Sequence, residues 1–132
     1  MSTFESKINI NKPVSDVYQY LSDFNNHQQL MPDSVQDWTS TVDEAHFGIQ
    51  NMVQLSLQII ERVENRSINI IATGKPPFAV KLYWNLAPDS NGTLATFTIN
   101  ADLNMMMKMM ASGPLQKLAD HQTIALRSAL TK

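Results

Sequence analysis

The C-terminal stretch from Met105 to Leu130 most constrains the fold of this 132-residue chain. It begins with a methionine cluster and then places its apolar residues within an arc of roughly 140° at the helical repeat of about 100° per residue. This face consists of Leu115, Leu118, Ala119, Gln122, Ala125, Leu126, Ala129 and Leu130. We expect a break at Gly113-Pro114, because proline lacks the amide hydrogen that a helix interior uses. The rest of the chain must cover the apolar face.

Strands with one apolar face provide the surface that can cover this helix. In seven segments apolar and polar residues alternate, which is typical of half-buried strands. These segments are residues 3–11, 35–42, 44–47, 50–64, 67–73, 78–86 and 93–104. Tight turns at Asn65-Arg66 and at Asp89 to Gly92 predict that consecutive strands run antiparallel. The pattern therefore predicts a meander.

Two short helices are expected after the first strand. Val14, Val17, Tyr18 and Leu21 have helical spacing behind Pro13, and residues 25–32 add a further turn or two. The order predicts an α+β fold, in which a curved antiparallel sheet of six to seven strands wraps around the long C-terminal helix. No repeat or linker interrupts the pattern, so we expect a single domain over residues 1–132.

The composition excludes several classes of partner. Ten Lys and Arg residues against 12 Asp and Glu residues leave a net charge of −2, and no basic run is present. Because phosphate binding needs clustered cations, nucleic acid is not expected as a partner. The absence of cysteine and of a long apolar run predicts a cytoplasmic protein without stable insertion into a membrane.

The order of elements resembles the SRPBCC superfamily, which includes START lipid-transfer domains, polyketide cyclases and birch-pollen-allergen-like proteins. The resemblance lies in residues 10–32 (INKPVSDVYQYLSDFNNHQQLMP), 76–84 (PPFAVKLYW) and 112–130 (SGPLQKLADHQTIALRSAL). It implies a helix-grip fold with a cavity between the sheet and the last helix for hydrophobic ligands. The glycine-rich loop of the plant allergens and the catalytic side chains of the cyclases have no counterparts here.

Catalytic or metal-binding motifs are absent from the sequence. His27, His46 and His121 lack the spacing of a metal site, so we interpret them as surface residues and expect neither a metal nor a cofactor. No nucleophile elbow or phosphate-binding loop is present. The sequence therefore favours binding over catalysis and leaves the question of enzymatic activity open. The alternative is a polyketide cyclase or dehydratase that uses Tyr18, Asp102 or His121 as an acid or base.

Gln122 is the polar exception on the apolar helix face. A buried amide must recover its lost hydration through hydrogen bonds. One interpretation is a partner within the protein, such as a backbone carbonyl, Ser6 or a buried water. The other is that Gln122 orients the polar end of a mostly apolar ligand.

The methionine cluster also allows alternatives. It consists of Met105, Met106, Met107, Met109 and Met110. Because thioether side chains adapt to irregular surfaces, the cluster could pack against the sheet, or form a deformable lid that hinges at Gly113-Pro114 opposite Met31. Transient contact with a membrane ranks last, since Lys108 is the only cation nearby.

These observations predict a protein that binds or transports a small hydrophobic or amphipathic molecule in an internal cavity. The expected lining consists of Leu55, Leu57, Ile70, Leu82, Trp84, Phe97, Ile99, Met106, Met110 and Gln122. An interaction module whose cavity is filled by side chains is the third possibility. Ile60, Ile71 and Ile124 lie on predicted outer faces, which leaves both a monomer and a homodimer open.

Overall fold

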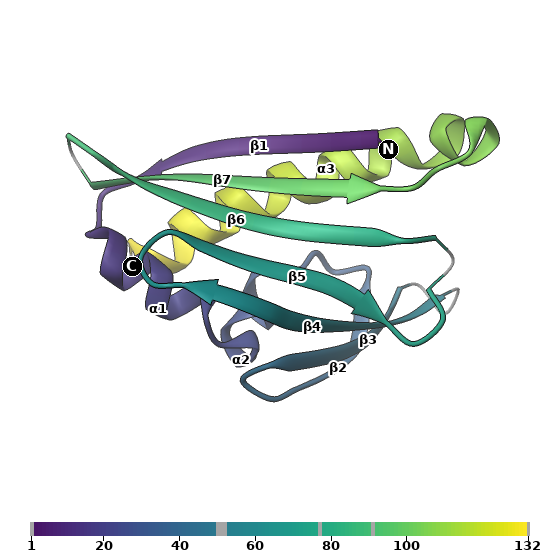
Figure 1. The fold of residues 1–132 in the computed structure, drawn as a ribbon, viewed down its shortest axis with the longest axis horizontal. Coiled ribbons are helices and arrows are strands. Elements are labelled where there is room, and N and C mark those ends of the chain that lie inside the picture. Colours follow the sequence, from purple (N-terminus) through teal and green to yellow (C-terminus); the bar gives the residue numbers. More distant parts are fainter. Residues whose placement is uncertain (1, 50–52, 77, 91, 132) are drawn as a thin grey trace.

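The computed structural model describes residues 2–49, 53–76, 78–90 and 92–131 of the chain (Figure 1). A strand comes first, then two short helices and a 3-10 turn, then six strands, and last a long helix, as predicted. The elements are β1 (Ser2–Ile10), α1 (Val14–Leu21), α2 (Phe24–His27), η1 (Gln28–Leu30), β2 (Val35–Ser40), β3 (Glu44–Ile49), β4 (Val53–Val63), β5 (Ser67–Thr73), β6 (Val80–Asp89), β7 (Gly92–Ala101) and α3 (Met105–Leu130). Residues 50–52 of the predicted fourth strand lie outside the described part of the chain.

The described strands form one antiparallel sheet in the order β1-β7-β6-β5-β4-β3-β2. All neighbours in the sheet are consecutive in sequence except β1, which pairs with β7 from Ser2↔Ala101 to Ile10↔Thr93. The sheet curls, and α3 crosses its concave side diagonally while packing mainly on β1, β7 and η1 (Figure 1). This is the predicted helix-grip fold.

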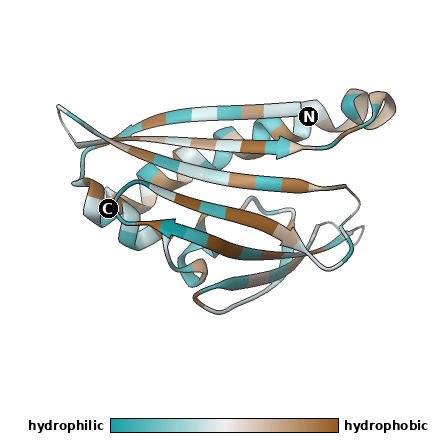
Figure 2. Ribbon diagram, viewed as in Figure 1, coloured by the Kyte–Doolittle hydropathy of each residue, from teal (hydrophilic) through white to brown (hydrophobic). Residues whose placement is uncertain are grey.

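Hydrophobic and hydrophilic residues alternate along the strands, as predicted (Figure 2). In β7, every second residue from Thr93 to Ala101 is buried. On the concave side, Trp84 of β6 stacks on Phe97 of β7 with 4.5 Å between the ring centroids. Since α3 and α1 cover this side, the core lies between the sheet and the helices.

Two hairpin turns depend on a positive φ angle. Asn65, with φ of 59°, closes the β4–β5 turn, where Arg66 donates its amide to the Val63 carbonyl at 2.9 Å. Gly92, with φ of +145°, begins β7, and a Cβ atom there would collide with the Ile10 carbonyl. A side chain at this position would therefore separate the β6–β7 hairpin from the end of β1.

The predicted break at Gly113-Pro114 is wrong, because α3 runs without interruption from Met105 to Leu130. Asn104 caps the start of α3, since its side chain accepts the Met107 amide at 2.9 Å. This cap places the helix start before the proline, and α3 loses only the one hydrogen bond that Pro114 cannot donate. Gly113 and Pro114 are both exposed, so neither is forced out of the helix by its surroundings.

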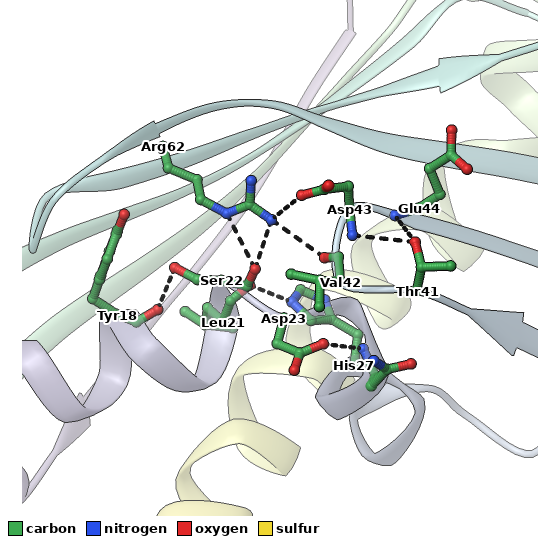
Figure 3. Close-up of polar contacts among 11 residues, drawn as sticks. Tyr18, Leu21, Ser22, Asp23, His27, Thr41, Val42, Asp43, Glu44 and Arg62 are labelled. Atoms are coloured by element: carbon green, nitrogen blue, oxygen red, sulfur yellow. Dashed lines mark hydrogen bonds and ion pairs between the residues drawn. The ribbon is translucent and has the colours of Figure 1, made fainter.

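Arg62 of β4 joins α1 and the β2–β3 turn to the sheet (Figure 3). Its guanidinium donates from Nε and Nη2 to the Ser22 carbonyl at 3.1 and 2.8 Å, and from Nη2 to the Val42 carbonyl at 3.2 Å. The same Nη2 lies 2.8 Å from a carboxylate oxygen of Asp43. One side chain thus fixes the end of α1 against the sheet.

The surface position predicted for His27 is wrong. The residue is buried at the end of α2, where its Nε2 lies 2.8 Å from the Leu21 carbonyl and its ring meets the edge of Phe24. Asp23 caps α2 by accepting the Asn25 amide, which turns the chain so that His27 faces inward. His46 and His121 are exposed, as predicted.

Candidate functional site

Seven of the ten predicted lining residues lie together on the concave side of the sheet. Six of them are apolar residues of β4 to β7, and the seventh is Gln122 of α3. All seven are buried: Leu57, Ile70, Leu82, Trp84, Phe97, Ile99 and Gln122. Their strands position them by pairing, since Leu82 stands opposite Ile70 on one side and Ile99 on the other.

The other three predicted lining residues lie elsewhere. Leu55, near the start of β4, is half-buried. Met106 and Met110 are 72% and 74% exposed, because the first turns of α3 extend past the end of β1 (Figure 1). The hydrogen bonds agree with this placement. Among the described residues, Gln116 is the first of α3 to bond to β1, by donating from Nε2 to the Glu5 carbonyl at 3.0 Å. Gln116 lies about 16 Å along the helix axis from Met105.

Packing between the sheet and the helices is unequal at the two ends of the molecule. Toward α1 and the β4–β5 turn, many apolar side chains are fully excluded from solvent, among them Ile10, Val17, Leu21, Phe24, Leu30, Ile68 and Leu126. At the other end, where α3 begins, apolar side chains from four strands and α3 are only half-buried. We call this group the open end: Val35, Leu55, Ala72, Val80, Leu115 and Leu118.

Gln122 makes an unusual contact inside the protein. Its side chain is 3% exposed, and its Nε2 lies 3.6 Å from the sulfur of Met31. The predicted partner Ser6 is instead bonded to Thr123, with 2.8 Å between the two hydroxyl oxygens. Because a thioether is a weak acceptor, the amide nitrogen of Gln122 recovers little of its lost hydration.

The indole of Trp84 has an unpaired polar atom. The side chain is fully buried, and its Nε1 has no hydrogen-bond partner among the described residues. A buried donor without an acceptor costs about 1–3 kcal/mol. Trp84 and Gln122 are therefore two donors in the interior whose hydrogen-bonding capacity is poorly used.

Titratable groups do not gather at this site. Burial lowers the pKa of His27 to about 4, outweighing the Leu21 hydrogen bond and the charge of Asp23. Of the three candidate acids and bases, Asp102 and His121 are exposed and Tyr18 is half-buried. Within residues 2–49, 53–76, 78–90 and 92–131, no three His, Cys, Asp or Glu side chains are placed to hold a metal ion.

Two hollows of about 400 Å³ and 430 Å³ lie away from the open end. The first is at the β4–β5 turn, beside Arg66 and Asn85. The second lies between α1 and the end of α3, where it includes Tyr20 and Leu130. Burial raises the pKa of Tyr20 in the second hollow. Neither hollow contains a predicted lining residue.

The curled sheet gripping a C-terminal helix defines the chain as an SRPBCC-type helix-grip protein, as its sequence resemblance implied. Residues 1–130 match the family described as polyketide cyclase / dehydrase and lipid transport. The chain belongs to this family. No match is found among curated proteins.

Solved structures with the same fold share little sequence with this chain. A START superfamily protein from Mycobacterium smegmatis is 14% identical, with a TM-score of 0.71 and coverage of 97% of this chain and 96% of the other. The di-domain ARO/CYC protein StfQ of the steffimycin biosynthetic pathway is 10% identical, with a TM-score of 0.77 over 97% of this chain and 50% of its own. The Aha1 dimer from Colwellia psychrerythraea is 15% identical, with a TM-score of 0.70 and coverage of 98% and 96%. At these identities the likeness concerns the fold.

Several residues of the open end were not predicted as part of the site. Ala72 and Val80 share their strand faces with Ile70 and Leu82, so strand alternation could have found them. Met31 was predicted to lie opposite the methionine cluster, but not as the partner of Gln122. Side-chain contacts between segments 91 residues apart leave no local signal in the sequence.

Proposed function

We propose that this protein binds and carries a small hydrophobic or amphipathic molecule between its sheet and α3. The observation that carries the proposal is the open end, where apolar residues of several elements converge without being fully covered. A ligand inserted there would bury these surfaces, and each square ångström of apolar area removed from water contributes about 25 cal/mol. The closed packing at the α1 end would limit how deep the ligand reaches.

The methionines at the start of α3 support this proposal. Met105, Met106, Met109 and Met110 are exposed on the turns that extend past the sheet beside the open end. Thioether side chains change rotamer at low cost and pack against varied apolar surfaces. We therefore propose that these turns form a deformable entrance, in which Met106 and Met110 contact the ligand as it enters.

Comparison with relatives supports binding of an apolar ligand over other functions. The family description includes lipid transport, and the START and ARO/CYC proteins share the fold. We favour binding over a cyclase or dehydratase activity, because Asp102 and His121 are exposed and Tyr18 is only half-buried. No helix of the described residues is long and apolar enough to cross a membrane. The predicted cytoplasmic location and the choice between monomer and homodimer stay predictions.

Native mass spectrometry of the purified protein, followed by organic extraction, tests the proposal. We expect a co-purifying apolar molecule, or saturable binding of a fluorescent apolar probe such as a naphthalene sulfonate dye. Absence of both would support an interior filled by side chains and refute the proposed function.

A volume change at the open end locates the site. Ala72→Leu adds three carbons to a half-buried position of β5 and should weaken probe binding by about tenfold or more, because the leucine occupies ligand space. Ala87→Leu is the matched control, because Ala87 is an exposed residue of β6. This variant should bind the probe as tightly as the unaltered protein does. Equal binding by both variants would place the ligand elsewhere.

A further inference from the structure

Two poorly satisfied donors lie in one transverse layer of the interior. Thr123 of α3 is bonded to Ser6 of β1, Ser6 pairs with Phe97 of β7, and Phe97 pairs with Trp84 of β6. Because neighbouring strands are about 4.8 Å apart, Trp84 is about 10 Å across the sheet from Ser6. Gln122 precedes Thr123, so the main chain of Gln122 lies in the same layer of the fold as that of Trp84.

The indole nitrogen of Trp84 and the amide nitrogen of Gln122 are both hydrogen-bond donors, so each needs an acceptor. The indole nitrogen of Trp84 is a donor without acceptor capacity, and it has no partner among the described residues. The amide nitrogen of Gln122 has the sulfur of Met31 as its hydrogen-bond partner at 3.6 Å. Met31 is half-buried and follows η1, and its flexible side chain can move aside at low cost. An oxygen atom would be a better acceptor for either donor than this sulfur.

The charge of the interior decides which oxygen compounds fit. The buried polar residues among those described are Ser2, His27, Thr93, Gln122 and Thr123. None is a cation at neutral pH, since the pKa of His27 is lowered to about 4. Arg62 is held at the α1 end by Asp43 and two carbonyls. A carboxylate in this layer would be buried without a counter-ion, which is strongly unfavourable.

We propose that Trp84 and Gln122 form the polar end of the binding site and select neutral apolar molecules that carry an acceptor oxygen, such as esters, over both carboxylates and plain hydrocarbons. This proposal rests on the proposed function and adds the class of ligand. On binding, the ligand oxygen replaces the Met31 sulfur beside Gln122 and brings an acceptor to the layer that holds the Trp84 indole. Because Trp84 and Gln122 are both buried, the ligand oxygen reaches the Gln122 amide only when Met31 moves aside.

Competition between matched ligands tests the selection. Methyl laurate, laurate and dodecane share one alkyl chain and differ in the polar end, and each is used to displace an apolar fluorescent probe at neutral pH. Methyl laurate should bind at least about tenfold more tightly than either of the others, the factor that one net hydrogen bond supplies. Laurate binding as tightly as the ester, or dodecane doing so, overturns the proposal and leaves the proposed function standing. Failure of all three and of the probe refutes both.

Substitutions assign the selection to the two residues. Trp84→Phe removes the indole donor and keeps an aromatic ring, and Gln122→Met removes the amide with little change in volume. Both variants should lose the preference for methyl laurate. Trp38→Phe is the matched control, because Trp38 donates to Ser40 and stacks on Phe47 away from this layer. An unchanged preference in both Trp84→Phe and Gln122→Met overturns the proposal.

A measurement on the unaltered protein covers the case in which Trp84→Phe fails to fold. In ¹⁵N-labelled protein, the indole N–H resonance of Trp84 should move downfield on addition of methyl laurate, as expected for a new hydrogen bond, and that of Trp38 should not. The Trp38→Phe spectrum assigns the two signals. A Trp84 resonance that stays in place while the ester binds overturns the role of its indole.

Discussion

His27 links the stability of the fold to pH through its burial. The imidazole is enclosed between α2 and the core, where it donates to the Leu21 carbonyl and contacts Phe24. Protonation would place a charge in this enclosed site, and burial accordingly lowers its pKa from 6.5 to about 4. The unfolded chain has no such restriction, so it binds the proton at a higher pH than the folded protein does.

Stability should therefore fall on acidification through the His27 site. The contribution is complete above pH 6.5, and it is lost as pH falls from about 6.5 to about 4, where only the unfolded state takes up the proton. The full loss is about 3 kcal/mol. Urea unfolding at several pH values measures it. His27→Gln should flatten the slope in this window, whereas the exposed His121→Gln should not; an equal slope in both would contradict the assignment.

Arg62 acts at the scale of elements, since it holds α1, the β2–β3 turn and β4 in one arrangement (Figure 3). Two of its acceptors are main-chain carbonyls at the end of α1 and in the turn after β2, and these carbonyls gain charge-assisted bonds from it. Its side chain is 29% exposed, whereas that of Asp43 is 61% exposed. The carbonyl bonds should therefore matter more than the ion pair.

Arg62→Met should lower the free energy of unfolding by about 1–3 kcal/mol, because it leaves the Ser22 and Val42 carbonyls without this donor. Asp43→Asn, which removes only the exposed ion pair, should cost less than about 1 kcal/mol. Chemical denaturation of the two variants compares them. A larger loss in Asp43→Asn would show that the ion pair dominates.

The first turns of α3 are exposed, so their helical order can be changed with little effect on the core. Gly113 and Pro114 follow the exposed methionines, and a Cβ atom at Gly113 would meet no neighbour within 4 Å. The double variant Gly113→Ala/Pro114→Ala restores one hydrogen bond and a better helix former. Amide hydrogen exchange between Lys108 and Ser112 should slow by about fivefold or more. Unchanged exchange would mean that the proline does not limit the order of these turns.

At the scale of the molecule, the two halves of α3 contribute differently. The second half, which contains Leu126, packs in the core and stabilises the fold, whereas the first half exposes its methionines to solvent. Replacing Met105, Met106, Met109 and Met110 together with Gln should change the free energy of unfolding by less than about 1 kcal/mol, because these side chains are exposed. Leu126→Ala in the second half should cost about 2–5 kcal/mol, because Leu126 is fully buried. Thermal and urea unfolding test both. A large loss in the methionine variant would place those residues in the core.

The sequence predicted the order of the elements well because strand alternation and helical spacing are local patterns. The concave faces of β4 to β7 and the apolar face of α3 follow directly from them. The continuity of α3 was missed, since the cap that Asn104 provides and the open surroundings of Pro114 outweigh the local preference of proline. Two features depend on contacts between segments that are apart in the sequence, and a local pattern cannot predict such contacts. They are the burial of His27 and the contact of Gln122 with Met31 instead of Ser6.

The pairing of β1 with β7 determines when the fold can be completed during synthesis. Ser2 cannot pair in the sheet until its partner Ala101 has been synthesised, and α3 follows Ala101 in the chain. Until then, the nascent meander of β2 to β6 exposes the edge of β6 and an uncovered apolar face, both of which favour aggregation. Contacts between residues so far apart in sequence also slow folding in vitro, as in other proteins of high contact order. The segment that forms β7 and α3 therefore covers the edge of β6 and the apolar face that the earlier strands leave exposed.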